Sequence, residues 1–239
     1  MTSFQNSKSN HFGRLLVFVF LMLVTVILTS ESLFLFGLGE RAQRIGGFIY
    51  SVFMAGFVLY TIPILTSLGY SRKVTRIVQI FAIAELVGSL YVSNPLLNVM
   101  SDDIQPYIFS LFHLTLLVGQ VLFARVILID IFSNKQTQTD HIWGAIVVYY
   151  LIIMMFSEVV EIIVLFNPGL LGETYVMGFP NYIQVIMFSV NCITGMDELY
   201  PEAHPLFLKM GNLENMIGNL FLVVILGRLL SHPIGKTKS

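Results

Sequence analysis

The chain has 239 residues, of which 56% are hydrophobic and 11% charged, with a mean hydropathy of +0.80 and a formal net charge of −1. A soluble domain carries about 25% charged residues, so this composition excludes a soluble protein and indicates an integral membrane protein. The near-neutral charge does not suggest a nucleic-acid partner, and the single cysteine, Cys192, excludes a disulfide within the chain.

Six apolar segments have close to the roughly 20 residues that a helix needs to cross a hydrocarbon core of about 30 Å. No small-residue cleavage site follows the first of them, which we therefore expect to stay in the mature protein. The pattern predicts an all-α membrane protein with six transmembrane helices. In chain order, the segments are 15–36, 48–68, 74–92, 107–132, 143–166 and 207–231.

Basic residues near the ends of the spans predict the orientation of the chain. With the N-terminus inside, ten basic residues fall on the cytoplasmic side, and only Arg41, Arg44 and Lys209 fall on the other. Six spans then place both termini in the cytoplasm, and we expect a multi-pass protein of the plasma (bacterial inner) membrane. The ten cytoplasmic residues are Lys8, Arg14, Arg72, Lys73, Arg76, Arg125, Lys135, Arg228, Lys236 and Lys238.

The stretch 179–201 differs from the six spans because its apolar part is too short to cross the membrane. About ten mostly apolar residues lead into the polar segment Thr194-Gly-Met-Asp-Glu198, and Tyr200-Pro201 precedes the last span. A half-crossing helix, a glycine-bearing turn and a return to the surface form a re-entrant loop. Backbone at that depth must be buried in protein or line a water-filled path, which favours a pore.

Residues 185–231 carry a family resemblance. The pattern comprises Phe188-Ser189, the segment Cys192-Ile-Thr-Gly-Met-Asp-Glu-Leu-Tyr-Pro201, and Leu213-Glu214, Ile217-Gly218 and Gly227-Arg228-Leu229 downstream. It resembles the pore of the tetrameric potassium-channel-like (voltage-gated-like cation channel) superfamily, especially bacterial two-span potassium channels. The resemblance implies a homotetramer with a cytoplasmic tail (1–13), a four-helix peripheral membrane domain (14–135) and a pore domain (136–239).

The resemblance also predicts the selectivity filter. Counting back from Pro201 places Gly195 on the first filter glycine, so that the filter comprises Ile193, Thr194, Gly195, Met196 and Asp197. Ile193 then replaces the family's threonine, although a one-residue gap would place Thr194 there. Asp197 replaces a glycine that supplies a left-handed backbone at low cost. Because backbone carbonyls select the ion, we expect monovalent cations without strict potassium selectivity, and divalent cations as a second hypothesis.

Two acidic residues are predicted to surround the outer mouth. In a fourfold assembly Asp197 and Glu198 bring eight carboxylates together, which concentrates cations and repels anions. Mutual repulsion favours proton uptake, so external acid is expected to reduce the current. The alternative is a solvated acidic turn at the membrane surface. No cofactor is expected, and the sequence does not identify a metal site.

The last span supplies candidates for an inner gate. Gly218 and Gly227 are candidate hinges, and Ile225 and Leu229 are candidates for a hydrophobic constriction that closes by losing its water. For Gly218 and for Gly227, the alternative is close packing between helices.

Four charged residues within spans are candidate buried charges: Glu85, Arg125, Glu158 and Glu161. Arg125 either pairs with Glu85 or extends to the membrane surface, and as the only arginine of its span it predicts weak voltage dependence. Glu158 and Glu161 share a helix face, where they either brace the pore helix, for example through Asn191, or bind a cation. His113 is expected to be a hydrogen-bonded, buried histidine.

The sequence leaves two other functions open. A secondary cation or proton transporter would use Glu85, Glu158 and Glu161 as a relay, but transporters usually carry broken helices in both halves. A non-conducting, channel-like accessory protein would assemble without a current. An enzyme is not expected, since no zinc, nucleophile-turn or phosphate-loop motif is present in the sequence.

Overall fold

The computed structural model describes residues 104–132, 138–171, 179–195 and 203–231, together with isolated positions between residues 13 and 87. Each regular element in these four segments is a helix, which agrees with the predicted all-α class. Apart from the isolated positions, the three predicted spans before residue 104 lie outside the described residues. The elements are α4 (Gln105–Phe132), α5 (Gln138–Phe166), the 3-10 helix η1 (Pro168–Leu171), α6 (Phe179–Thr194) and α7 (Pro205–Ser231).

Three of the described helices are long and apolar enough to cross a membrane, over Pro106–Phe132, His141–Phe166 and Pro205–Arg228. They coincide closely with the last three predicted spans. The apolar part of α6, Tyr182–Thr194, is shorter. The chain is therefore a helical membrane protein with a short apolar helix between two long ones.

Prolines mark several helix ends. Pro106, Pro180 and Pro205 occupy the first turns of α4, α6 and α7, where a missing backbone N–H costs no helical hydrogen bond. Helix α5 ends at Phe166, shortly before Pro168, because proline disfavours the helical conformation of the residue before it. No proline interrupts the interiors of α4, α5 and α7, which run unbroken over 28, 29 and 27 residues.

Helices α4 and α5 form an antiparallel pair with a continuous core. Gly144 of α5 lies against α4 so closely that a Cβ atom at this position would be 3.1 Å from the Ile131 side chain. Ile127 and Ile131 pack there with Val148 and Leu151, all of them buried. The predicted boundary at residue 135 therefore falls between two helices that share one core.

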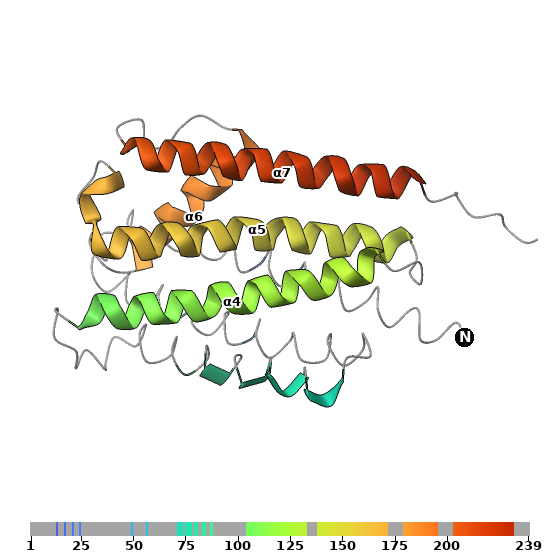
Figure 1. Ribbon diagram of the computed structural model, residues 1–239, viewed down its shortest axis with the longest axis horizontal. Coiled ribbons are helices and arrows are strands. Elements are labelled where there is room, and N and C mark those ends of the chain that lie inside the picture. The colour runs from blue at the N-terminus through green and yellow to red at the C-terminus, as the bar shows by residue number, and fades with distance from the viewer. Residues whose placement is uncertain are drawn as a thin grey trace, which may run out of the picture.

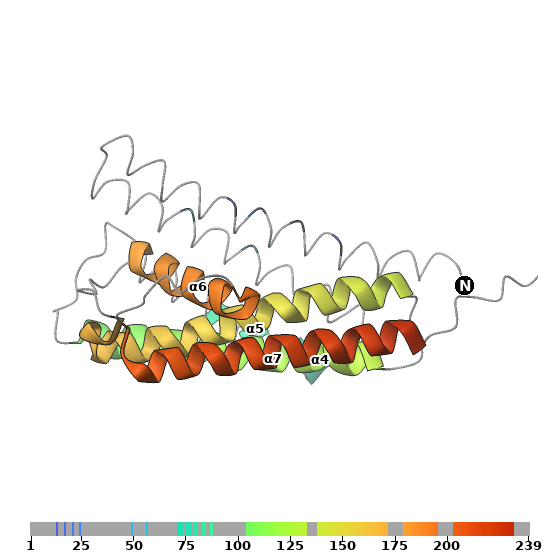
Figure 2. The same ribbon diagram turned by 90° about the horizontal axis from the view of Figure 1, so that it is seen from above.

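Helix α7 packs along α5, so that α4, α5 and α7 lie side by side (Figure 1). Helix α6 packs on one side of this layer, against α5 and α7 (Figure 2). The buried positions of α7 follow one another at intervals of three or four residues or a multiple of these, which places them on one helix face. They are Phe207, Gly211, Glu214, Gly218 and Ile225.

The contacts of α6 define how far it reaches along α5. Tyr182, near its start, bonds Glu158 of α5, whereas the carbonyl of Ile193, near its end, faces Tyr149 of α5. These two α5 residues are nine positions apart, or about 14 Å along a helix. Because Tyr149 lies near the middle of α5, α6 ends about halfway along the long helices.

Helix α7 begins at the same end of the long helices as α6, next to the C-terminus of α5. The backbone N–H of His204, just before α7, donates a 2.9 Å hydrogen bond to the carbonyl of Leu170 in η1, which follows α5. Residues 196–202 lie outside the described residues. Seven residues span at most about 23 Å when extended, which is enough to return over the depth that α6 covers.

Candidate functional site

The C-terminus of α6 ends in a left-handed glycine. Gly195 has a φ of 70°, and it is the only described residue with a positive φ. Its N–H donates a 3.3 Å hydrogen bond to the Cys192 carbonyl, which closes the last turn. Glycine follows helix ends in this conformation because it has no Cβ to clash with the backbone. Gly195 therefore stops α6 about halfway along α5 and α7.

Side chains from both neighbouring helices cap this terminus. The Asn215 side-chain amide of α7 donates to the Cys192 carbonyl at 2.8 Å, and the Asn219 amide donates in turn to the Asn215 oxygen at 2.5 Å. From α5, the Tyr149 hydroxyl donates to the Ile193 carbonyl at 3.4 Å. The last carbonyls of a helix have no partners within it, so these donors satisfy groups that the helix itself leaves open.

The first two residues of the predicted filter belong to α6. Ile193 and Thr194 are its last two residues, and the Thr194 hydroxyl donates at 2.7 Å to the Val190 carbonyl of the same helix. The Ile193 side chain is buried, because it fits against the bare backbone of Gly218. Ile193 and Thr194 are therefore helical and not extended. Met196, Asp197 and Glu198 lie outside the described residues.

Replacing Asn215 with alanine is expected to loosen the end of α6, because the Cys192 carbonyl loses its α7 donor. The expected cost is about 1 kcal/mol in the free energy of unfolding, a typical value for one buried hydrogen bond. Denaturation in detergent measures it. Asn212→Ala is the matched control, since Asn212 lies one turn away on α7 and is exposed. Equal losses in both variants would contradict the cap.

The two glycines of the predicted inner gate have different surroundings. A Cβ atom on Gly218 would lie 2.4 Å from Cγ1 of Ile193, whereas a Cβ atom on Gly227 would meet nothing within 4 Å. Gly218 therefore provides close packing between α6 and α7, the alternative that the sequence had left open. At Gly227 no described residue makes such a contact.

The predicted gate residue Ile225 does not fit its role. Its side chain is buried in the core formed with α4 and α5, because it lies on the same face of α7 as Gly218. A constriction requires side chains that face a shared axis, and the exposed side chains nearby are those of Leu222, Val223, Val224 and Leu226. The side chain of Leu229 lies outside the described residues.

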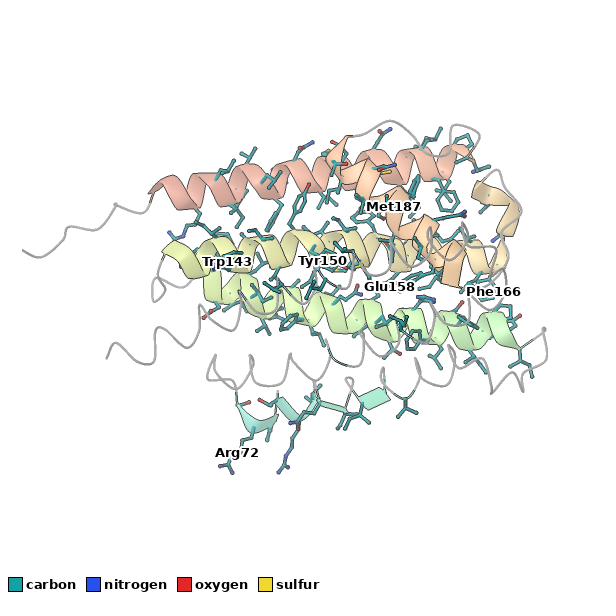
Figure 3. The ribbon with its side chains drawn as sticks, turned by 180° about the vertical axis from the view of Figure 1, so that it is seen from behind. Arg72, Trp143, Tyr150, Glu158, Phe166 and Met187 are labelled. Atoms are coloured by element: carbon teal, nitrogen blue, oxygen red, sulfur yellow. The ribbon has the colours of Figure 1, made fainter. Side chains whose placement is uncertain are left out.

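Glu158 is the centre of a buried polar network that joins α4, α5 and α6. Its carboxylate accepts hydrogen bonds from Tyr182 (2.7 Å), from the Gln120 amide (3.3 Å) and, at 2.5 Å, from Nδ1 of His113. Figure 3 shows Glu158 between Tyr150 and Phe166 along α5. Both carboxylate oxygens have donors, so the geometry favours bracing of α6 over cation binding. Tyr182, not Asn191, makes the link.

The other predicted buried charges have different positions. Glu161 is 2% exposed and lies within electrostatic reach of His113, next to the Glu158 network. Glu85 lies outside the described residues. Arg125 is exposed, which favours the alternative that its side chain extends to the membrane surface over a buried pair.

Glu214 is a buried carboxylate whose burial was not predicted from the sequence. It is 1% exposed and faces Ser189 of α6, but neither carboxylate oxygen makes a well-formed hydrogen bond to a described residue. A signal was present in the sequence. Glu214 lies between Gly211 and Gly218 at spacings of three and four, and two glycines on one face mark a surface that contacts another helix.

No protein-family model, curated protein or solved structure matches this chain. The fold and the site define its class, a helical membrane protein in which a short, capped helix ends between two helices long enough to span a membrane.

Proposed function

We propose that the chain is the pore-forming subunit of a tetrameric, weakly voltage-dependent cation channel. The observation that carries the proposal is the position of α6, a 16-residue helix that ends at a left-handed glycine beside the middle of α5 and α7. Polar backbone at that depth is stable only where protein or water satisfies it. A re-entrant loop at the axis of an assembly meets this condition.

The electrostatics of α6 favour cations. The C-terminus of a helix carries a partial negative charge, and the α6 terminus lies at mid-depth, where a low dielectric strengthens the field. Asp197 and Glu198 follow Gly195 within three residues and add carboxylates to the same loop. Cations entering from the outside therefore meet negative charge first at the mouth and then at the helix end.

The uncovered face of α7 supports an assembly around a watery axis. Asn212 and Asn219 are exposed in this span and Asn215 is partly buried, and their spacing places all three on one side of the helix. An exposed amide that faces hydrocarbon is unfavourable, so water or a neighbouring subunit in contact with Asn212 and Asn219 would stabilise this face. The large exposed side chains of α7, such as Leu220 and Val223, supply apolar surface for a neighbouring copy.

Fourfold symmetry, six spans and cytoplasmic termini come from the sequence and its resemblance. The proposed cargo is monovalent cations moving down their gradient, with divalent cations as a second candidate. The carboxylate oxygens of Glu158 are occupied by hydrogen-bond donors from α4 and α6. This favours a channel over a transporter that would load and release a proton there.

Planar bilayers containing the purified full-length protein provide the test. Under a potassium chloride gradient, we expect a reversal potential close to that of potassium and a current that falls as external pH is lowered. The double variant Asp197→Asn/Glu198→Gln is expected to lower the conductance at low salt several-fold, and the difference is expected to shrink at high salt because ions screen the ring. Glu173→Gln is the control, an acid outside the proposed loop.

Three outcomes would reject this function. A tetramer that carries no current selects the non-conducting accessory protein. Flux that requires a second, coupled ion selects the transporter. A chain that remains a monomer in bilayers removes the shared axis on which the pore depends.

A further inference from the structure

A groove between α4 and α5 lies apart from the proposed pore. Its volume is about 460 Å³, and we refer to it as the α4–α5 groove. Nearly all of its lining is apolar, and Arg125 is the single charged residue among those that line it. The main lining residues are Val121, Arg125, Leu128, Ile129 and Phe132 of α4, and Met155 of α5.

Arg125 is a cation without a counterion among the described residues. It is exposed, and no hydrogen bond or ion pair joins it to another side chain in the part of the chain that the structure describes. The nearest acid on α4, Asp130, is five positions further on and therefore points about 140° away around the helix. An unpaired charge among apolar side chains at a membrane surface is unfavourable, so an anionic group from outside the chain would stabilise it.

The groove lies toward the predicted cytoplasmic end of the protein. The C-terminal ends of α4 and α7 meet there, where the Arg228 guanidinium donates to the Phe132 carbonyl at 3.5 Å. Arg72 lies toward the same end as Trp143, the end opposite Phe166 (Figure 3). Arg125 is seven residues before the end of α4, about 10 Å along the helix, so its long side chain can extend toward the headgroups.

We propose that the α4–α5 groove is a binding site for an anionic phospholipid. One acyl chain lies along the apolar lining, and the phosphate accepts hydrogen bonds from Arg125. The guanidinium has a planar fork of donors that matches a phosphate, and the cytoplasmic leaflet supplies anionic lipids. The site goes beyond the proposed channel function and does not depend on it, because no groove residue belongs to α6 or α7.

Native mass spectrometry of the full-length protein in mild detergent tests the site, with dioleoyl phosphatidylglycerol as the probe and dioleoyl phosphatidylcholine as the neutral reference. We expect the wild type to retain phosphatidylglycerol preferentially. Arg125→Gln is expected to weaken phosphatidylglycerol binding about five-fold, the effect of one interfacial basic residue, and to leave phosphatidylcholine unchanged. Arg125→Lys keeps the charge and is expected to keep most of the preference. Arg76→Gln, which removes another exposed charge outside the groove, is the control.

A second pair of variants tests the apolar part of the groove. Ile129→Trp fills the groove and is expected to lower phosphatidylglycerol retention, whereas Leu114→Trp changes a residue of similar exposure (50% against 54%) outside it and is expected to have no effect. Size-exclusion profiles verify that each variant folds.

Four results would overturn the site. In the first, Arg76→Gln lowers retention as much as Arg125→Gln, which indicates general attraction by surface charge. In the second, glycerol phosphate without acyl chains binds as well as the lipid. In the third, the Arg125 and Ile129 variants retain phosphatidylglycerol like the wild type. In the fourth, Ile129→Trp changes the oligomeric state but not lipid retention, which assigns the groove to a second copy of the chain.

Discussion

Replacing Gly218 with valine is expected to push α7 away from α6 and to abolish any current. The Cβ atom would lie 2.4 Å from Cγ1 and 2.9 Å from Cδ1 of Ile193, a buried side chain with little room to move. Overpacking of this kind typically costs about 1–3 kcal/mol in the free energy of unfolding. The same displacement would carry Asn215 away from the Cys192 carbonyl that it caps.

Gly227→Val is the matched control for this prediction. It makes the same substitution on the same helix, where a Cβ atom meets nothing within 4 Å, so its stability is expected to stay near that of the wild type. The double variant Gly218→Val/Ile193→Ala removes the clashing atoms of Ile193. It is expected to recover part of the free energy of unfolding that Gly218→Val loses. Detergent denaturation and bilayer recordings measure the two effects. If both glycine variants lost equal stability, Gly218 would not be a packing position.

Replacing Glu158 with leucine is expected to be strongly destabilising, by roughly 3–5 kcal/mol, because it leaves three buried donors without an acceptor. These donors are His113, Gln120 and Tyr182, on α4 and α6. Their loss separates the two helices that Glu158 holds to α5. The midpoint of denaturation in detergent measures the change, and Glu158→Gln, which keeps one acceptor oxygen, is expected to lose less.

Glu214→Leu is the matched control, and the opposite result is expected for it. Glu214 is as deeply buried as Glu158, yet neither oxygen has a well-formed hydrogen bond to a described residue. Replacing a buried polar group that lacks partners with an apolar side chain is often neutral or stabilising. A loss at Glu214 as large as the loss at Glu158 would show that hydrogen bonding does not distinguish these two carboxylates.

The positions of the long helices could be predicted from the sequence. Apolar length alone indicates the spans over 107–132, 143–166 and 207–231, because an uninterrupted hydrophobic run can be satisfied in hydrocarbon only as a helix. The short helix and its glycine stop at Gly195 were also predictable, since the apolar run before Thr194 is too short to cross.

The directions of individual side chains could not be predicted in the same way. Apolar residues are distributed around all sides of α4 and α7, because lipid and protein core are equally apolar. The hydropathy pattern therefore does not predict whether Ile225 faces a pore axis or α5. It also does not predict whether Arg125 is buried or exposed. The partners of Glu158 likewise depend on Tyr182 and His113, which are 24 and 45 positions away in the chain.

By itself, the amino-acid sequence determined that this is a helical membrane protein, where its last three long helices lie, and that a shorter helix leads into the glycine-bearing segment that begins at Thr194. Only the tertiary structure decided that Gly218 packs against Ile193, that Glu158 joins three helices, and that Glu214 is buried. The physical reason is that hydropathy and backbone preference are local properties of the chain. Which helix faces meet is decided by close packing and by hydrogen bonds between residues far apart in sequence.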